Sequence, residues 1–506
     1  MKRLVLPFVF LSLFFVSLSA AVPEGLVKSF TLQNGMKFLV VERHEAPTIS
    51  CVILYDVGSA DEPFGKTGMA HLLEHLMFKG SKEMGTTDWE KERPLFDQSN
   101  AETHKWIEAM EVSRKENPPG VFPEDVKITQ TEAIKKEEAA LKEILDKERQ
   151  FIIKDEFWGT YDRNGGRNQN AFTSEDRTVY FVILPANKLE LWGIMESQRM
   201  DKAVFREFFS ERDVVMEERR LSDETDPDGR IWETLQGEAF RNHPYGRPVV
   251  GWWDDLRHLS QEDEAAFYHA YYKPNNAVAV VAGDTTVEKV KAVAEKYFGP
   301  LPSREIPKRH WTQEPPMEGR REANVVFDAQ PQIVLAYRAP GAQHPDFPAL
   351  QLAASILGGG ESARLNKRLV LKDKIASSAY AWCGEMRDPY LLNVWCVPFK
   401  GHSVDEMEKA IKEEVEKLKK DGPEEKELAK VKNEHHANSI YRLESPVWLA
   451  LWLGGNEQKY GDWREGYRYL DRIDAVTAAD IQRVLSKYLV FENEVKVTLQ
   501  QKEKSK

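Results

Sequence analysis

The chain has 506 residues, too many for one ordinary hydrophobic core, so we expect two or three domains. Its content of 42% apolar and 30% charged residues is typical of a globular protein. The net charge of -12 argues against nucleic acid as a partner, because phosphate binding needs a basic patch and none stands out. The scattered Cys51, Cys383 and Cys396 are too few for a disulfide framework, so we expect small buried side chains there and no cysteine catalysis.

The first residues have the pattern of an export signal. Lys2 and Arg3 precede an apolar run over residues 4–18, and small residues follow at positions 19–21. We therefore expect a signal peptide at 1–21, a periplasmic or secreted mature protein, and no stable membrane insertion after cleavage. The alternative is an uncleaved membrane anchor, since apolar character continues almost to Val22, but Pro7 and the small residues favour cleavage.

Residues 22–300 carry the signals of an α+β domain. Asn34-Gly35 suits a tight turn between two strands, because this pair tolerates positive φ. A charged segment over about 89–161 interrupts the domain, and helical spacing at 131–151 predicts a helical insertion there. The other elements expected are strands at 30–32, 36–41, 49–57, 178–184 and 277–282, and helices at about 68–78, 189–200 and 210–221, the last ended by 226–229.

A segment rich in proline and charge, residues 301–318, is the expected linker to a C-terminal domain at 319–503. That domain has expected strands at 325–327, 333–337, 391–397 and 495–499 and a helix at 347–357. The order is loosely that of the first half, which suggests two duplicated α+β domains, each with a mainly antiparallel sheet and helices packed on one face. Only the first copy carries residues of the metal-binding type.

The central motif is His71-Leu72-Leu73-Glu74-His75. At 3.6 residues per turn, His71 and His75 lie on one helical face, where two imidazoles can bind one zinc ion. Glu74 lies beside them as the expected general base that takes a proton from a metal-activated water. The alternative is a pair of core histidines beside a capping glutamate.

A catalytic zinc site needs a third protein ligand, and the expected helix at 210–221 offers it. Glu211 and Glu218 are seven residues apart and share a face, whereas Glu217 points about a third of a turn away. One of the facing pair can bind metal while the other orients His75 or a water. Spacing alone leaves open a solvated acidic face paired with Arg212 and Arg219.

An ordered series of motifs resembles the pitrilysin, or inverzincin, family of zinc metallopeptidases. The motifs are GMAHLLEHLMFKG at 68–80, GG at 165–166, NAFT at 170–173, ERDVVMEE at 211–218, YGRPVVG at 245–251 and YKPNN at 272–276. The layout is closest to members that form one half of the enzyme, such as the beta-type subunit of mitochondrial processing peptidase and exported bacterial relatives. The resemblance covers nearly all of the chain after the signal.

The resemblance implies a zinc endopeptidase with one Zn²⁺ per chain. His71, His75 and Glu218 match its metal ligands, Glu74 its general base and Glu211 its supporting acid. Asn170 and Ala171 match an edge strand that pairs with the backbone of unfolded peptide substrates. Family members enclose substrates between two halves of a clamshell, so a second family subunit, the same or different, is implied as partner.

Two features depart from the family pattern. His75 and Glu218 are 143 positions apart, an interval wider than usual by roughly the insertion, which should loop out without disturbing the site. A solvated helical hairpin is the simplest interpretation, and a docking or lid element is the alternative. The Arg and Tyr that hold the scissile carbonyl are matched only by Lys372 and Tyr380 at awkward spacing, which favours a separate metal-free partner subunit.

Three functions remain from the sequence. The first is an exported zinc endopeptidase for unfolded peptides. The second is a noncatalytic scaffold or processing subunit of a peptidase complex, against which the complete set of metal-site residues speaks. The third is a metal-binding interaction protein at the cell surface, in which the charged insertion docks a partner.

Overall fold

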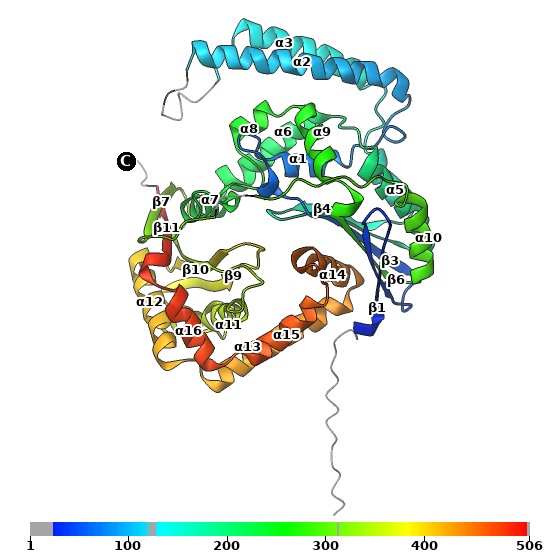
Figure 1. Cartoon of the computed structure of the whole chain (residues 1–506). Coiled ribbons are helices and arrows are strands. Elements are labelled where there is room, and N and C mark those ends of the chain that lie inside the picture. The colour runs from blue at the N-terminus through cyan, green and yellow to red at the C-terminus, as the bar shows by residue number, and fades with distance from the viewer. Residues whose placement is uncertain (1–23, 119, 121–127, 311–312, 503–506) are drawn as a thin grey trace, which may run out of the picture.

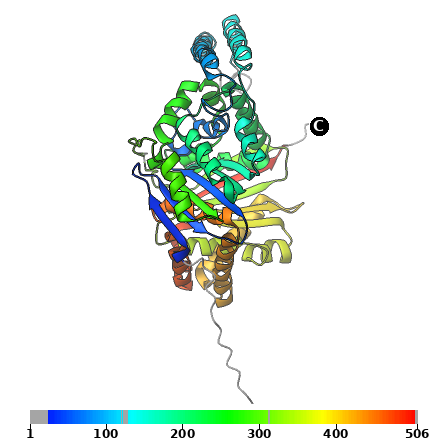
Figure 2. The same ribbon diagram turned by 90° about the vertical axis from the view of Figure 1, so that its right-hand side faces the viewer.

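The computed structural model describes residues 24–118, 120, 128–310 and 313–502 of the chain. The expected signal peptide, residues 1–21, lies outside the described residues. Figures 1 and 2 show two β-sheets, each with helices packed on it, and a helical hairpin at one end of the molecule. No helix in the described ranges is long and apolar enough to cross a membrane.

The first sheet has six strands in the order β1-β2-β6-β3-β5-β4, so β4 forms one of its edges. Gly35, with φ of +89°, lies in the turn between β1 and β2, which confirms the hairpin expected at Asn34-Gly35. Only β2 and β6 are parallel neighbours in this sheet. The strands are β1 Val27–Thr31, β2 Lys37–Glu42, β3 Thr48–Tyr55, β4 Arg167–Thr173, β5 Thr178–Pro185 and β6 Ala277–Gly283.

The second sheet repeats this topology with five strands in the order β7-β11-β8-β10-β9. Strands β7 to β11 take the places of β2 to β6, including the one parallel pair, β7 with β11. The expected duplication of an α+β unit is therefore confirmed at the level of strand order. The strands are β7 Arg321–Phe327, β8 Gln332–Ala339, β9 Ala376–Cys383, β10 Tyr390–Pro398 and β11 Glu494–Gln501.

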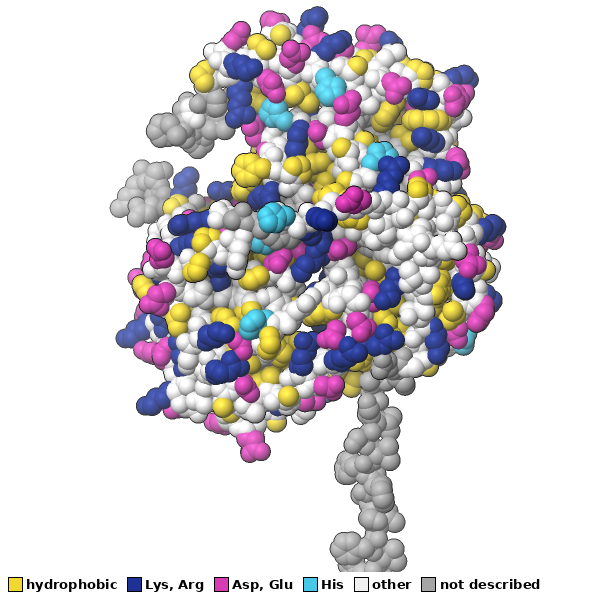
Figure 3. Space-filling model, in the orientation of Figure 1, with side chains coloured by type: hydrophobic (Ala, Val, Ile, Leu, Met, Phe, Trp, Pro, Cys, Tyr) yellow, Lys and Arg dark blue, Asp and Glu magenta, His cyan; other side chains and the backbone are white. Residues whose placement is uncertain are grey.

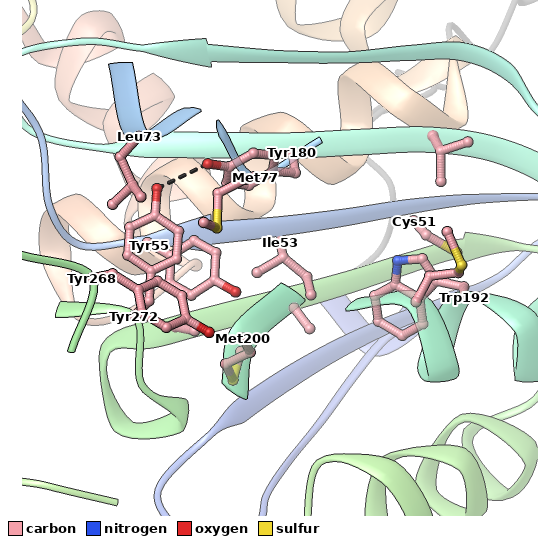
Figure 4. Close-up of a cluster of buried hydrophobic side chains, with 14 of the residues drawn as sticks. Cys51, Ile53, Tyr55, Leu73, Met77, Tyr180, Trp192, Met200, Tyr268 and Tyr272 are labelled. Carbon is pink, nitrogen blue, oxygen red and sulfur yellow. Dashed lines mark hydrogen bonds between the residues drawn. The ribbon is translucent and has the colours of Figure 1, made fainter. Parts of the chain in front are cut away.

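Each half packs its own helices on one face of its sheet. In the first half, Trp192 and Tyr268 from these helices meet Cys51 and Tyr55 of β3 in the core shown in Figure 4. All three cysteines are buried and unpaired, as expected. The helices are α1 Met69–Leu76, α5 Leu189–Asp201, α9 Gln261–Tyr271 and α10 Val287–Tyr297 on the first sheet, and α11 Phe347–Gly358, α12 Val404–Asp421 and α16 Ala478–Tyr488 on the second.

The opposite face of each sheet is covered by a helix from the other half. Helix α7, Pro227–Ala239, packs on β7 and β11, and helix α14, Pro446–Tyr460, packs on β3 and β6. The fit is close, since a Cβ on Gly454 of α14 would lie 2.2 Å from Cδ1 of Leu54. Because both faces are covered, β3 is buried over seven of its eight residues instead of alternating.

The end of the metal-site helix differs from the sequence expectation. Helix α6, Phe208–Arg219, continues into a π-helical turn, Arg220–Glu224. Residues 226–229 were expected only to end this helix, but Asp226 begins α7 by accepting hydrogen bonds from the backbone N–H groups of Asp228 and Gly229. An aspartate followed by proline suits the start of a helix, because proline has no N–H to leave unsatisfied there.

The insertion forms the helical hairpin expected from its sequence. Helices α2, Trp89–Glu116, and α3, Glu132–Glu148, run side by side at the top of Figure 1, with α4, Glu156–Arg163, after them. In Figure 3, lysine, arginine and acidic side chains are interspersed with hydrophobic ones on the visible surface of this end of the molecule. The base of the hairpin is fixed by an ion pair between Glu92 and Arg206, both fully buried.

The remaining helices connect these layers. The expected linker, residues 301–318, has no helix or strand in its described part. Its Arg309 binds Asp56 and Asp61, at 2.9 and 2.6 Å, so this segment is held against the first half. The connecting helices are α8 Trp253–His258, α13 Glu425–Glu444 and α15 Glu465–Ala475.

Candidate metal centre

Helix α1 presents the polar stripe of the His71 motif from a buried position. Met69, Leu72, Leu73 and Leu76 are buried beneath it. The buried carboxylate of Glu62 accepts hydrogen bonds from the N–H groups of Gly68 and Ala70, at 3.0 and 2.8 Å, and so caps the first turn. The helix is therefore fixed at its start and along its apolar side.

The structure brings His71, His75 and Glu218 together. Oε2 of Glu218 lies 3.6 Å from Nε2 of His71 and 3.6 Å from Nε2 of His75. One donor atom from each of the three side chains lies within 4.8 Å of the others. Donor atoms around a tetrahedral zinc ion are about 3.3–3.4 Å apart, given Zn–N distances of about 2.0–2.1 Å. The donor set and its spacing therefore fit a zinc ion with an open fourth position.

The two histidines have different electrostatic surroundings. Burial, together with the neighbouring His75, lowers the pKa of His71 to about 3, so its imidazole is neutral, as a metal ligand must be. Burial alone would lower the pKa of His75, but its hydrogen bond to Glu211 and the nearby carboxylates of Glu218 and Glu74 raise it above its ordinary value. His75 therefore sits in a field that stabilises positive charge at the site.

Glu211 lies behind His75 and not among the three donors. Its Oε2 is 3.4 Å from Nδ1 of His75, and its Oε1 is 2.6 Å from Nζ of Lys79. Burial would raise the pKa of Glu211, but the contacts with His75 and Lys79 lower it, so the carboxylate is ionised. Lys79, which was not predicted from the sequence, lies in the turn that follows the end of α1 at Leu76.

The alternative pairing of the acidic helix face with arginines is wrong. Arg219 pairs with Glu233 at 2.9 Å, and Arg212 donates to the backbone oxygen of Arg257 at 3.1 Å. Glu217 points to solvent and pairs with Arg220 at 2.7 Å. Glu211 and Glu218 thus share the face toward α1, as their seven-residue spacing predicts.

Glu74 is held beside the three donors. Its side chain is buried, and its Oε2 accepts a hydrogen bond of 2.5 Å from Oγ1 of Thr173 on β4. Burial raises the pKa of Glu74, and the Thr173 hydrogen bond opposes that shift. Thr173 is the last residue of the NAFT motif at 170–173, but no sequence pattern pairs it with Glu74, which lies 99 residues earlier in the chain.

A cleft of about 430 Å³ opens over these residues. His71 and Glu74 line it with Ala171 and Thr173 of edge strand β4, and Trp232 of α7 closes another side. Asn170 is exposed next to the cleft, where its Oδ1 accepts from the N–H of Ala171 at 2.9 Å. Among the described residues, none of the insertion lines the cleft, and neither do Lys372 and Tyr380.

Two models of peptidase family M16 match the chain. The model described as insulinase (peptidase family M16) matches residues 37–105, which include the His71 motif. The model described as the peptidase M16 inactive domain matches residues 258–434, which begin after Glu218. The three potential donors therefore lie outside the part that resembles the inactive domain.

Curated relatives and solved structures agree with these matches. The zinc protease PqqE of Helicobacter pylori is 28% identical over 431 residues, covering 84% of this chain and 81% of its own. A probable mitochondrial-processing peptidase subunit beta of Arabidopsis thaliana is 23% identical, covering 91% of this chain and 75% of its own. The crystal structure of a protease from Helicobacter pylori superposes with a TM-score of 0.76 and 26% identity, over 94% of this chain and 99% of that one. The duplicated two-sheet fold of half a clamshell is thereby confirmed, and the chain contains domains similar to those of the insulinase, or pitrilysin, family of peptidases, M16.

Proposed function

We propose that this chain is an exported zinc-dependent endopeptidase that hydrolyses unfolded peptides. The observation that carries the proposal is the convergence of His71, His75 and Glu218 within 4.8 Å, with His71 and Glu74 lining one cleft. The donors include two imidazoles and one carboxylate, which is a set used by catalytic zinc in peptidases.

The residues around the cleft have distinct roles in this reaction. A zinc ion held by the three donors would polarise the scissile carbonyl and activate the attacking water. Glu74 takes the proton that the water loses and passes it to the leaving nitrogen, and Thr173 keeps the carboxylate aimed into the cleft. Glu211 and Lys79 hold His75 in one orientation.

Edge strand β4 is the proposed docking site for the substrate backbone. An extended peptide joins an exposed edge through main-chain hydrogen bonds, so recognition depends on conformation more than on sequence. Ala171 lines the cleft from this strand, and its N–H is the group that a substrate carbonyl would take over from the Asn170 side chain. Folded proteins cannot present such a strand and would be poor substrates.

We also propose that a second family subunit completes the enzyme outside the cytoplasm. The relative named as a subunit beta covers most of this chain, which supports a role as one part of an assembly. Lys372 and Tyr380 lie away from the cleft, so the groups that hold the substrate carbonyl would come from another subunit. Export rests on the signal pattern at residues 1–21, and a mature chain beginning at Val22 would support it.

The experiment combines zinc content with cleavage of a quenched unfolded peptide. Wild type is compared with Glu74→Gln and with the control Glu217→Gln, whose side chain lies on α6 but points to solvent and pairs with Arg220. Each is tested alone and with any subunit that co-purifies. We expect about one zinc per chain in all three, and loss of turnover in Glu74→Gln only. Zinc binding without cleavage under either condition would favour the noncatalytic scaffold instead.

A further inference from the structure

A cavity of about 730 Å³ lies between the helical hairpin and the side of α6 that faces away from the metal centre. Helices α2 and α3 supply one wall, and α6 with Arg257 of α8 supplies the other. This volume lies within the range of roughly 300–1,000 Å³ typical of small-molecule sites. The hairpin therefore does not only extend into solvent. It encloses a space beside α6, the helix that carries Glu211 and Glu218.

Arg212 of α6 is a buried cation in this wall. Only 6% of the residue is exposed, and its Nε has no hydrogen-bond partner among the described residues. Its guanidinium makes one hydrogen bond, to the backbone oxygen of Arg257, and no carboxylate oxygen of the described chain lies within ion-pair distance. Burial lowers its pKa to about 10, which leaves it charged at neutral pH. A buried charge without a counter-ion is costly, so an anion entering the cavity would be stabilised.

Trp106 of α2 places a second unpaired donor beside Arg212. The guanidinium carbon of Arg212 lies 4.9 Å from the centroid of the Trp106 ring, and the Trp106 Nε1–H is buried without an acceptor. Two unpaired donors from different helices thus border one cavity. A compact acceptor such as a carboxylate can satisfy both.

The rest of the lining combines apolar residues with polar and charged ones, and apolar atoms contribute the larger share of its surface. The apolar residues come from both walls and would surround a hydrocarbon body: Met110, Leu141, Leu145, Ile152, Phe209 and Met216. Met110 and Leu141 are buried, which marks the hairpin side as the deeper part of the cavity. Apolar walls with two convergent donors are the pattern of a site for an amphipathic ligand.

We propose that this cavity binds a small amphipathic carboxylate of the fatty-acid type, with its head group on Arg212 and Trp106 and its tail between α2, α3 and α6. The lining also contains the acidic residues Asp213, Glu138, Glu207 and Glu148, none of which forms an ion pair with Arg212 among the described contacts, and the most buried of them is Glu148. One of its oxygens is buried without a partner, and burial raises its pKa to about 7, so it is partly neutral and a weak competitor for Arg212 at neutral pH. The site is independent of the proposed peptidase function, because none of its lining residues borders the metal-site cleft.

Calorimetric titration of the full chain tests the proposal, with dodecanoate and its neutral analogue dodecanol as probes below their micellar concentrations. We expect one dodecanoate per chain and at least tenfold weaker binding of dodecanol, since hydrogen bonds to charged groups contribute about 1.5–3 kcal/mol. Arg212→Gln should weaken dodecanoate at least tenfold and leave dodecanol unchanged. The control Arg93→Gln, at an exposed arginine on the same hairpin, should change neither.

Two further variants keep the test decisive if Arg212→Gln folds poorly by circular dichroism. Trp106→Phe removes the N–H donor, keeps an aromatic ring beside Arg212 and should weaken dodecanoate several-fold. Leu145→Trp fills the cavity and should weaken both probes. Equal binding of dodecanoate and dodecanol, unchanged affinity in Trp106→Phe and Leu145→Trp, or no binding to the wild type would overturn the proposal.

Discussion

Replacing Glu211 by glutamine should weaken zinc binding about tenfold while leaving the fold intact. The substitution keeps the size of the side chain and removes its charge. In the structure, Glu211 reaches Nδ1 of His75 at 3.4 Å and Nζ of Lys79 at 2.6 Å. With glutamine at this position, Nδ1 of His75 would have no carboxylate partner. Lys79 would keep one ion pair, with Glu207 at 3.3 Å.

The magnitude follows from the length of the contact. Loss of a carboxylate behind a ligating histidine typically weakens metal binding by about 10- to 100-fold. The distance between Glu211 and His75, 3.4 Å, exceeds the usual range of about 2.7–3.2 Å for such hydrogen bonds, so we expect the lower end. A tenfold change corresponds to about 1.4 kcal/mol of binding free energy.

The dissociation constant is measured by competition between the metal-free chain and a chromophoric zinc chelator. Glu217→Gln is the matched control, because it removes the same charge from the same helix at a side chain that pairs with Arg220 in solvent. Thermal unfolding of the metal-free variants checks the fold. A Glu211→Gln constant within twofold of wild type, or an equal loss in Glu217→Gln, would refute the assigned role.

Three further predictions concern the supports of the site. Glu62→Ala removes the buried cap of α1 and should lower the free energy of unfolding by about 1–3 kcal/mol in urea denaturation; no loss would mean that water replaces the carboxylate. Thr173→Val should move the acid limb of the pH profile of kcat/KM to higher pH, because the lost hydrogen bond stabilises ionised Glu74, and Thr173→Ser should restore it; identical profiles would contradict this. Gly454→Leu should cost about 1–3 kcal/mol or more in thermal unfolding, against little cost for Gly237→Leu, whose Cβ meets open space; equal costs would disprove close packing of α14.

Local sequence patterns predicted individual strands and the faces of individual helices. Apolar runs located strands such as β3 and β5, and the spacing of His71, His75, Glu211 and Glu218 placed each pair on one helical face. Strand β9 was missed, because small and polar residues alternate with Tyr380 and Trp382 and the segment reads as irregular.

Long-range contacts could not be predicted in this way. Thr173 reaches Glu74 only because β4 aligns beside α1. Glu92, near the start of the insertion, pairs with Arg206, which lies well after its end in the chain. Helices α7 and α14 were not predicted from the sequence, and nothing in their own sequences says which sheet each one covers. These pairings depend on the topology of the whole chain and not on periodicity.

The exchange of α7 and α14 between the halves bears on how this fold arose and how it can be divided. Each half covers a sheet face of the other with one of its helices, α7 or α14. This arrangement resembles a twofold dimer in which each subunit packs one helix on its partner. A single-unit ancestor of this topology would have needed a second copy of itself to cover its sheet, and duplication with fusion through residues 301–318 would have made that pairing permanent. A chain cut at this segment should accordingly fold only when both fragments are produced together, because either one alone would expose the sheet face that the missing helix covers.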